Sequence, residues 1–99
     1  MTKIVQDLQQ DSLKTLYKKH GIRYLGLFGS YARGEENKDS DVDLLVDFNG
    51  TKSLFDLANV KIYFEDLLGK KVDLAMKGRL KKILEPNIKK DLITIYEKN

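Results

Sequence analysis

The chain has 99 residues, of which 41% are hydrophobic, and its 18 Lys and Arg against 15 Asp and Glu give a net charge of +3. This length predicts a single domain over residues 1–99 with one modest core. The sequence has no cysteine, which excludes a disulfide framework and a thiolate zinc site. It shows neither a signal peptide nor the roughly 18 consecutive apolar residues of a membrane span. We therefore expect a soluble protein, with the cytoplasm as its default location.

The first predicted elements are a helix and a buried strand. Apolar residues keep helical spacing from Ile4 up to His20, and Gly21 then suits a left-handed helix end. His20 is expected to cap this helix or lie on the surface rather than to act chemically. The apolar run Ile22–Phe28 predicts a strand that stops at Gly29.

A short helix, a loop and a second strand are expected next. Ser30 could cap a helix through residues 31–36, and the polar segment 35–40 predicts a surface loop. The apolar run Asp41–Phe48 predicts a strand, followed by a turn at Asn49 and Gly50. The two strands would flank the short helix.

The second half of the chain predicts a long helix, a third strand and a helical tail. The helix starts at Ser53 and ends at Gly69, and Lys70–Met76 follows as a strand. The tail from residue 79 is predicted helical, with Pro86 opening a new first turn and a weaker signal over Leu92–Tyr96. The order of elements predicts an α+β fold, with helices packed against a small mixed sheet.

Two carboxylates stand at the head of the second predicted strand. Alternation along a strand places Asp41 and Asp43 on one face, and Val42, Leu44 and Val46 on the other. Like charges this close repel unless a cation compensates them. Oxygen ligands without neighbouring His or Cys favour Mg²⁺ or Mn²⁺, ions that commonly complete their coordination with water and substrate phosphates. Surface strands also carry such pairs without function.

Asp73 supplies a third carboxylate within the third predicted strand. If the long helix brings that strand beside the second one, Asp73 would lie next to Asp41 and Asp43. Three acids on two neighbouring strands suit two metal ions about 3.5–4 Å apart, an arrangement used in phosphoryl and nucleotidyl transfer. The carboxylates therefore predict a nucleotide substrate.

The Gly29–Ser30 turn is the complementary candidate for a triphosphate. Glycine lets a backbone approach a ligand closely, and the start of a helix favours anions, although ordinary turns use the same residues. Arg33 could bind the phosphates, or pair with Glu35 or Asp41. Ser40 could orient Asp41 or simply end the loop.

These motifs resemble a known signature. The segment GSYARG from Gly29, followed by SDVDL from Ser40, resembles the DNA polymerase β-like nucleotidyltransferase superfamily, and more narrowly its minimal nucleotidyltransferase (MNT) family. The resemblance spans nearly the whole chain, and Asp73 matches the position of the family's third catalytic acid. It implies the nucleotidyltransferase fold, with Asp41, Asp43 and Asp73 as metal ligands.

The resemblance also implies an activity and a partner. Members of this family commonly act as antitoxins beside a HEPN-type protein, and some transfer AMP from ATP to a tyrosine of that partner. All three acids and the Gly-Ser pair are present here, so we expect an active, Mg²⁺-dependent enzyme with ATP as substrate and a hetero-oligomer with its partner. We do not expect a membrane or a nucleic acid as a direct ligand.

Three other functions stay open. The chain could neutralise a partner by occlusion without catalysis, modify a small molecule, or extend a nucleic acid. A chain this short offers no evident pocket for a small acceptor. Extension of a nucleic acid would depend on the late basic residues in KGRLKK and IKKD, which a solvated helical face explains more simply. Leu54, Phe55 and Tyr63 could serve an oligomer interface or the core.

Overall fold

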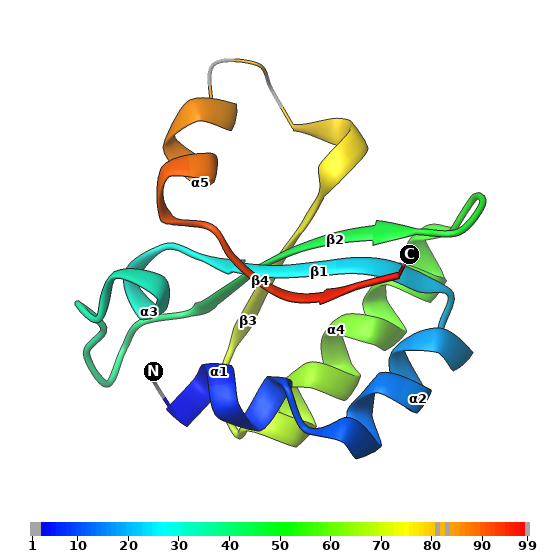
Figure 1. Cartoon of the computed structure of the whole chain (residues 1–99), viewed down its shortest axis with the longest axis horizontal. Helices are drawn as coiled ribbons and strands as arrows, with labels where there is room; N and C mark the ends of the chain where they lie inside the picture. Colours follow the sequence, from blue (N-terminus) through cyan, green and yellow to red (C-terminus); the bar gives the residue numbers. More distant parts are fainter. Residues whose placement is uncertain (1–2, 81, 83, 99) are drawn as a thin grey trace.

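A computed structural model describes residues 3–80, 82 and 84–98, and in that part of the chain four strands form one mixed sheet (Figure 1). The strands are β1 (Ile22–Phe28), β2 (Val42–Phe48), β3 (Val72–Met76) and β4 (Ile93–Glu97). The helices are α1 (Lys3–Leu8), α2 (Asp11–Lys19), α3 (Ser30–Arg33), α4 (Leu54–Leu68), the 3-10 helix η1 (Lys77–Arg79) and α5 (Glu85–Asp91). Within the described residues, no helix is both long and apolar enough to span a bilayer.

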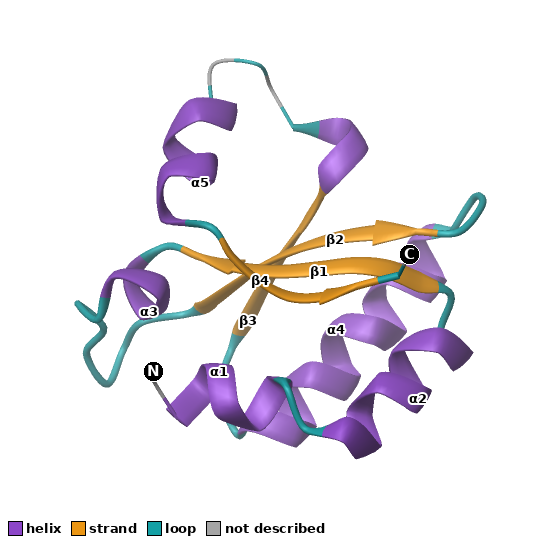
Figure 2. Cartoon of the chain, in the orientation of Figure 1, coloured by secondary structure: helices purple, strands orange, loops and turns teal. Residues whose placement is uncertain are grey.

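The helices are distributed unequally over the two faces of the sheet. Figure 2 shows α1, α2 and α4 together on one face, whereas α5 and η1 stand on the other face. The strand order is β3-β2-β1-β4, with β2 and β3 parallel and the other pairs antiparallel. A parallel pair needs a long crossover, which α4 provides, so β2 and β3 begin at the same edge of the sheet. This confirms the predicted α+β fold with a mixed sheet.

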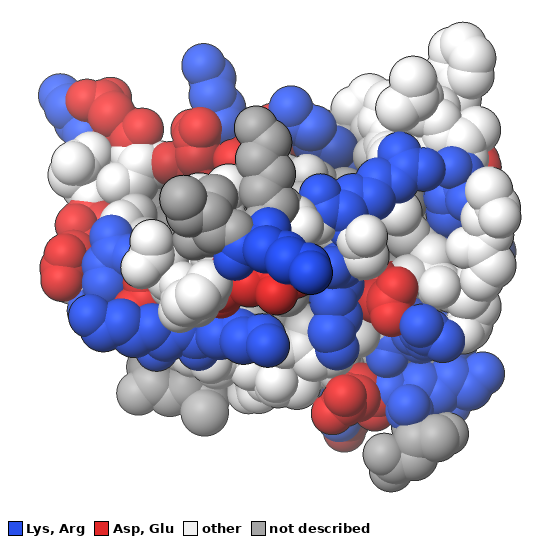
Figure 3. Space-filling view, turned by 90° about the horizontal axis from the view of Figure 1, so that it is seen from above, with Lys and Arg blue, Asp and Glu red and all other residues white. Residues whose placement is uncertain are grey.

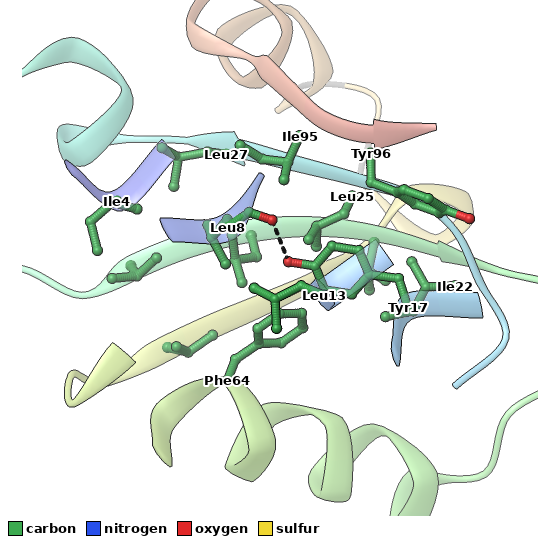
Figure 4. Close-up of a cluster of buried hydrophobic side chains, with 14 of the residues drawn as sticks. Ile4, Leu8, Leu13, Tyr17, Ile22, Leu25, Leu27, Phe64, Ile95 and Tyr96 are labelled. Atoms are coloured by element: carbon green, nitrogen blue, oxygen red, sulfur yellow. Dashed lines mark hydrogen bonds between the residues drawn. The ribbon is translucent and has the colours of Figure 1, made fainter. Parts of the chain in front are cut away.

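The main core lies between the sheet and α1, α2 and α4. Alternate residues of β2 face it, since Val42, Leu44 and Val46 are fully buried. Tyr17 and Phe64 add aromatic rings whose centroids lie 6.0 Å apart. Figure 4 shows Tyr17 and Phe64 between the helices and the strands. The opposite face of the sheet is consequently left to more polar residues.

The N-terminal helix is broken where the sequence predicted one continuous helix. α1 ends at Leu8 and α2 begins at Asp11, because Gln10 adopts an extended ψ of 137°. Tyr17 compensates, since its hydroxyl donates a 2.7 Å hydrogen bond to the Leu8 carbonyl (Figure 4). A helix end otherwise leaves such carbonyls without a partner. The break lets both halves bury apolar residues against the same sheet, among them Leu13.

The tail also differs from the single helix that was predicted. Helix α5 covers only Glu85–Asp91, with Pro86 in its first turn as expected, and the weak signal over Leu92–Tyr96 corresponds mainly to β4. Leu92, which links α5 to β4, packs against Gly26 of β1. A larger residue would not fit there, since a Cβ at Gly26 would lie 2.7 Å from Leu92 Cδ1. Residues 81 and 83 of the predicted helix lie outside the described part of the chain.

The long helix α4 was predicted correctly because both of its ends carry strong signals. Ser53 and Asp56 form a reciprocal capping box, and Gly69 closes the helix with a left-handed φ of 65°. The flanking strands are shorter than predicted and begin at Val42 and Val72.

Candidate functional site

The parallel register of β2 and β3 places two of the predicted carboxylates side by side. Asp43 and Asp73 are direct partners in this pairing, on strands that typically lie about 4.7–4.9 Å apart. Asp41 precedes β2 and therefore stands at the same edge. Because Val42 and Leu44 point into the core, Asp43 faces the side of the sheet away from α4. The expectation that the third strand lies beside the second is confirmed.

The charge on Asp43 is disfavoured by its surroundings. Partial burial raises the pKa of this carboxyl above its usual 3.8, and the negative charges of Asp73 and Asp41 raise it further. Arg33 acts in the opposite direction without cancelling these effects. The site thus gathers negative charge, of which Arg33 offsets only a part at Asp43.

Gly29 brings the backbone against this cluster. Phe28 pairs with Asp43 across β1 and β2, and the carboxylate of Asp43 lies so close to Gly29 that a Cβ would collide with it. Gly29 also has φ 78° and ψ −156°, a conformation that is essentially restricted to glycine. Both observations explain why glycine is needed here.

Ser30 is the first residue of α3 rather than its cap. The capping position belongs to Gly29, whose carbonyl accepts 3.1 Å hydrogen bonds from the amides of Ala32 and Arg33. Glycine takes this position because the chain turns there with a positive φ. Ser30 is half-buried and directly follows Gly29, which contacts Asp43.

Arg33 has an ion-pair partner that the sequence did not indicate. Its guanidinium lies 2.7 Å from Asp91 at the end of α5 and 3.4 Å from Glu35. The pairing with Glu35 was one of the expected alternatives, and no ion pair with Asp41 occurs among the described residues. Asp91 is 58 positions away, so only the folded chain reveals it.

Ser40 and His20 have structural contacts. The Ser40 hydroxyl accepts a 3.0 Å hydrogen bond from the Asn37 amide, which supports its role in ending the loop. His20 caps α2, and its ring centroid lies 5.4 Å from that of Tyr63. The structural interpretation of His20 is thus supported.

A cleft of about 390 Å³ opens beside Asp41. It lies between the loop before β2 and the turn before β3, and its lining residues are Lys38, Asp39, Ser40, Asp41, Gly69, Lys70 and Lys71. The lysines were not among the predicted site residues, although Lys70 and Lys71 directly precede the strand that carries Asp73. Their ammonium groups can offset the negative charge of a ligand in this cleft.

The carboxylates suit a divalent metal in their chemistry, but their side chains do not form a closed set of ligands. Within the described residues, no group of three or more His, Cys, Asp or Glu side chains is arranged to hold a metal ion. Even so, the three aspartates are hard oxygen donors at one sheet edge, and burial together with the charges of Asp73 and Asp41 raises the pKa of Asp43.

Comparison with known proteins identifies relatives. A family model described as nucleotidyltransferase domain matches residues 7–97. The protein adenylyltransferase MntA of Thermococcus cleftensis is 43% identical over 82 residues, which are 83% of this chain and 83% of that protein. A solved structure of a putative minimal nucleotidyltransferase superposes with a TM-score of 0.74 at 35% identity, and the match covers 94% of this chain and 95% of that one.

A second solved structure shares the fold at lower identity. It is a complex of a tri-AMPylated Shewanella oneidensis HEPN toxin with an MNT antitoxin, and the match has a TM-score of 0.68 at 18% identity. The match covers 93% of this chain and 72% of the chain in that complex. The chain therefore belongs to the nucleotidyltransferase domain family, and it is an enzyme with the fold of the minimal nucleotidyltransferases.

Proposed function

We propose that the chain transfers AMP from ATP to a tyrosine hydroxyl of a HEPN-type partner protein and thereby acts as its antitoxin. The observation that carries this proposal is the pairing of Asp43 with Asp73 beside Asp41 and the Gly29 turn. Two relatives support the chemistry. One is named a protein adenylyltransferase, and the other is a complex with an AMPylated HEPN toxin.

The aspartates have separate roles in this proposal. Asp41 and Asp43 would hold the metal ions, and Asp73 would bind one of them and help to deprotonate the attacking hydroxyl. Mg²⁺ bound there would neutralise the phosphate charge and polarise the α-phosphate. The acceptor oxygen forms a bond to the α-phosphorus, the bond from that phosphorus to the bridging oxygen of the β-phosphate breaks, and pyrophosphate leaves.

The turn after β1 binds the triphosphate. The close approach of Gly29 to Asp43 brings backbone and carboxylate to the same point, so phosphates at the turn would lie next to the aspartates. Ser30 offers its hydroxyl there. Arg33 adds positive charge while Asp91 keeps its guanidinium in place. Ser40 shapes the loop beside Asp41. Catalysis then depends on positioning and charge neutralisation.

The test is transfer of label from α-labelled ATP to proteins of the native host lysate in Mg²⁺. GTP, CTP and UTP are compared in parallel. We expect one labelled protein band with ATP, and no band with Asp43→Asn. Asp47→Asn is the matched control, because Asp47 lies on the same strand but pairs with Arg23 at 2.7 Å.

Two results would contradict the proposal. A labelled band of full intensity with Asp43→Asn would show that Asp43 is not required for catalysis. If Asp43→Asn neutralised the partner as well as the unaltered chain does, and no nucleotide produced a band with the partner present, neutralisation would occur by occlusion.

A further inference from the structure

The face of the sheet that carries α5 and η1 has an apolar hollow near the carboxylates. It has a volume of about 160 Å³ and lies between β2, η1 and α5. Its apolar lining consists of Leu45, Leu80, Ile88 and Leu92, and the charged residues at its border are Lys77, Glu85 and Lys89. Leu45 follows Asp43 by two positions in β2, so both side chains are on the same face of the sheet. The hollow is therefore distinct from the aspartate cluster but adjacent to it.

The chain segment that forms much of the hollow is basic, although the aspartate cluster lies next to the hollow. Residues 77–90 contain six Lys or Arg and a single acidic residue, Glu85. Figure 3 looks down on the face that carries α5 and shows Lys and Arg side chains spread across it. Among the described residues, no carboxylate forms an ion pair with Lys77, Lys89 or Lys90. Asp91, which follows this segment, is already paired with Arg33.

Lys77 is held over the sheet. Its ammonium group lies 4.5 Å from the ring centroid of Tyr24, a cation–π distance that restrains the side chain on this face. The hollow thus combines an apolar floor with a positive border, which suits an apolar group carried by an acidic molecule.

We propose that this hollow docks the acceptor protein through an acidic segment that inserts one large apolar side chain. The inference rests on the proposed function, because it assumes that the acceptor is a protein. The volume admits a single side chain of the size of leucine or phenylalanine, and such buried anchors dominate protein interfaces. Acidic residues beside the anchor would complement the lysines and accelerate association.

The lining favours a protein over a nucleic acid. Single-stranded nucleic acids bind by stacking their bases on aromatic rings, whereas the apolar lining of this hollow is aliphatic. Two residues of a strand span about 6.6 Å. If the anchor side chain of the acceptor contacts Leu45, a hydroxyl group close to that anchor in the acceptor would therefore be within reach of Asp43 and Asp73.

The test is an NMR titration of the ¹⁵N-labelled chain without nucleotide. The probe is the capped peptide Glu-Glu-Phe-Glu-Glu, with Glu-Glu-Ser-Glu-Glu and a 12-nucleotide single-stranded RNA as comparisons. We expect the phenylalanine peptide to shift the amide signals of Leu45, Ile88 and Leu92, and to bind at least tenfold more tightly than the serine peptide.

Charge reversal supplies the matched control. Lys89→Glu with Lys90→Glu should weaken peptide binding at least tenfold, whereas Lys18→Glu with Lys19→Glu, at the end of α2, should leave it unchanged. The proposal is overturned if the phenylalanine peptide fails to shift these signals, if both double variants weaken binding equally, or if RNA shifts them and the peptide does not. The titration contains no ATP, so failure of nucleotidyl transfer would be seen separately, in the labelling assay.

Discussion

Asp43 destabilises the folded chain when it is ionised. Its pKa in the folded chain lies above the usual 3.8, so folding favours the protonated carboxyl. That favourable contribution is complete below pH 3.8 and is lost as the pH rises through the raised pKa. At pH 7 in EDTA we therefore expect Asp43→Asn to raise the thermal unfolding midpoint, measured by circular dichroism. Asp47→Asn, which loses its pairing with Arg23, should not raise it. A lower midpoint for Asp43→Asn would contradict the charge assignment.

Gly29→Ala should be destabilising for two reasons. A side chain would be forced into a glycine-only backbone conformation, which costs about 1–3 kcal/mol, and it would displace the Asp43 carboxylate. Gly50→Ala is the matched control, since Gly50 also has a positive φ of 77° but open space around it. Urea denaturation should show a larger loss for Gly29→Ala. Equal losses would mean that the contact with Asp43 is unimportant.

The part of the candidate site that depends on the geometry of the strands was predictable from the sequence. Alternation placed Asp43 on the face away from the core, and the long helix allowed the third strand, with Asp73, to lie beside the second. The pairing of Arg33 with Asp91 depends on how α5 docks. No local pattern encodes that contact.

At the scale of elements, the break between α1 and α2 depends on one buried hydroxyl. Tyr17→Phe removes the donor to the Leu8 carbonyl and leaves that acceptor without its partner, which should cost about 1–3 kcal/mol of unfolding free energy. Tyr63→Phe serves as the control, because among the described residues its hydroxyl makes no hydrogen bond. Chemical denaturation of both variants measures the difference. If the two variants were equally stable, the hydrogen bond would not support the break.

Local signals explain which elements were predicted well. Helix α4 has a capping box at Ser53 and a terminal glycine, so its ends were evident. The break after Leu8 was not, since the apolar spacing continues through it. The segment of strand β4 gave only a weak signal, because the strand has five residues and is completed by pairing with β1.

At the scale of the whole molecule, Mg²⁺ and ATP should stabilise the fold together. A ligand that binds only the folded state at 100 times its Kd adds about 2.7 kcal/mol. Because protons compete for Asp43, whose pKa is raised, the gain in unfolding midpoint should be larger at pH 8 than at pH 5. Differential scanning fluorimetry can measure this gain, and Asp43→Asn should abolish most of it. An equal gain in the variant would place the ligand elsewhere.

Single-turnover transfer of AMP to the acceptor, once it has been purified from the labelled band, tests the catalytic role of the carboxylates most directly. The unaltered chain and Asp47→Asn should label the acceptor in Mg²⁺ and fail to do so in EDTA. Asp41→Asn, Asp43→Asn and Asp73→Asn should each reduce the rate by several orders of magnitude while the variants remain folded. Transfer at an undiminished rate by any of these three variants, or in EDTA, would contradict a metal site built from the three aspartates.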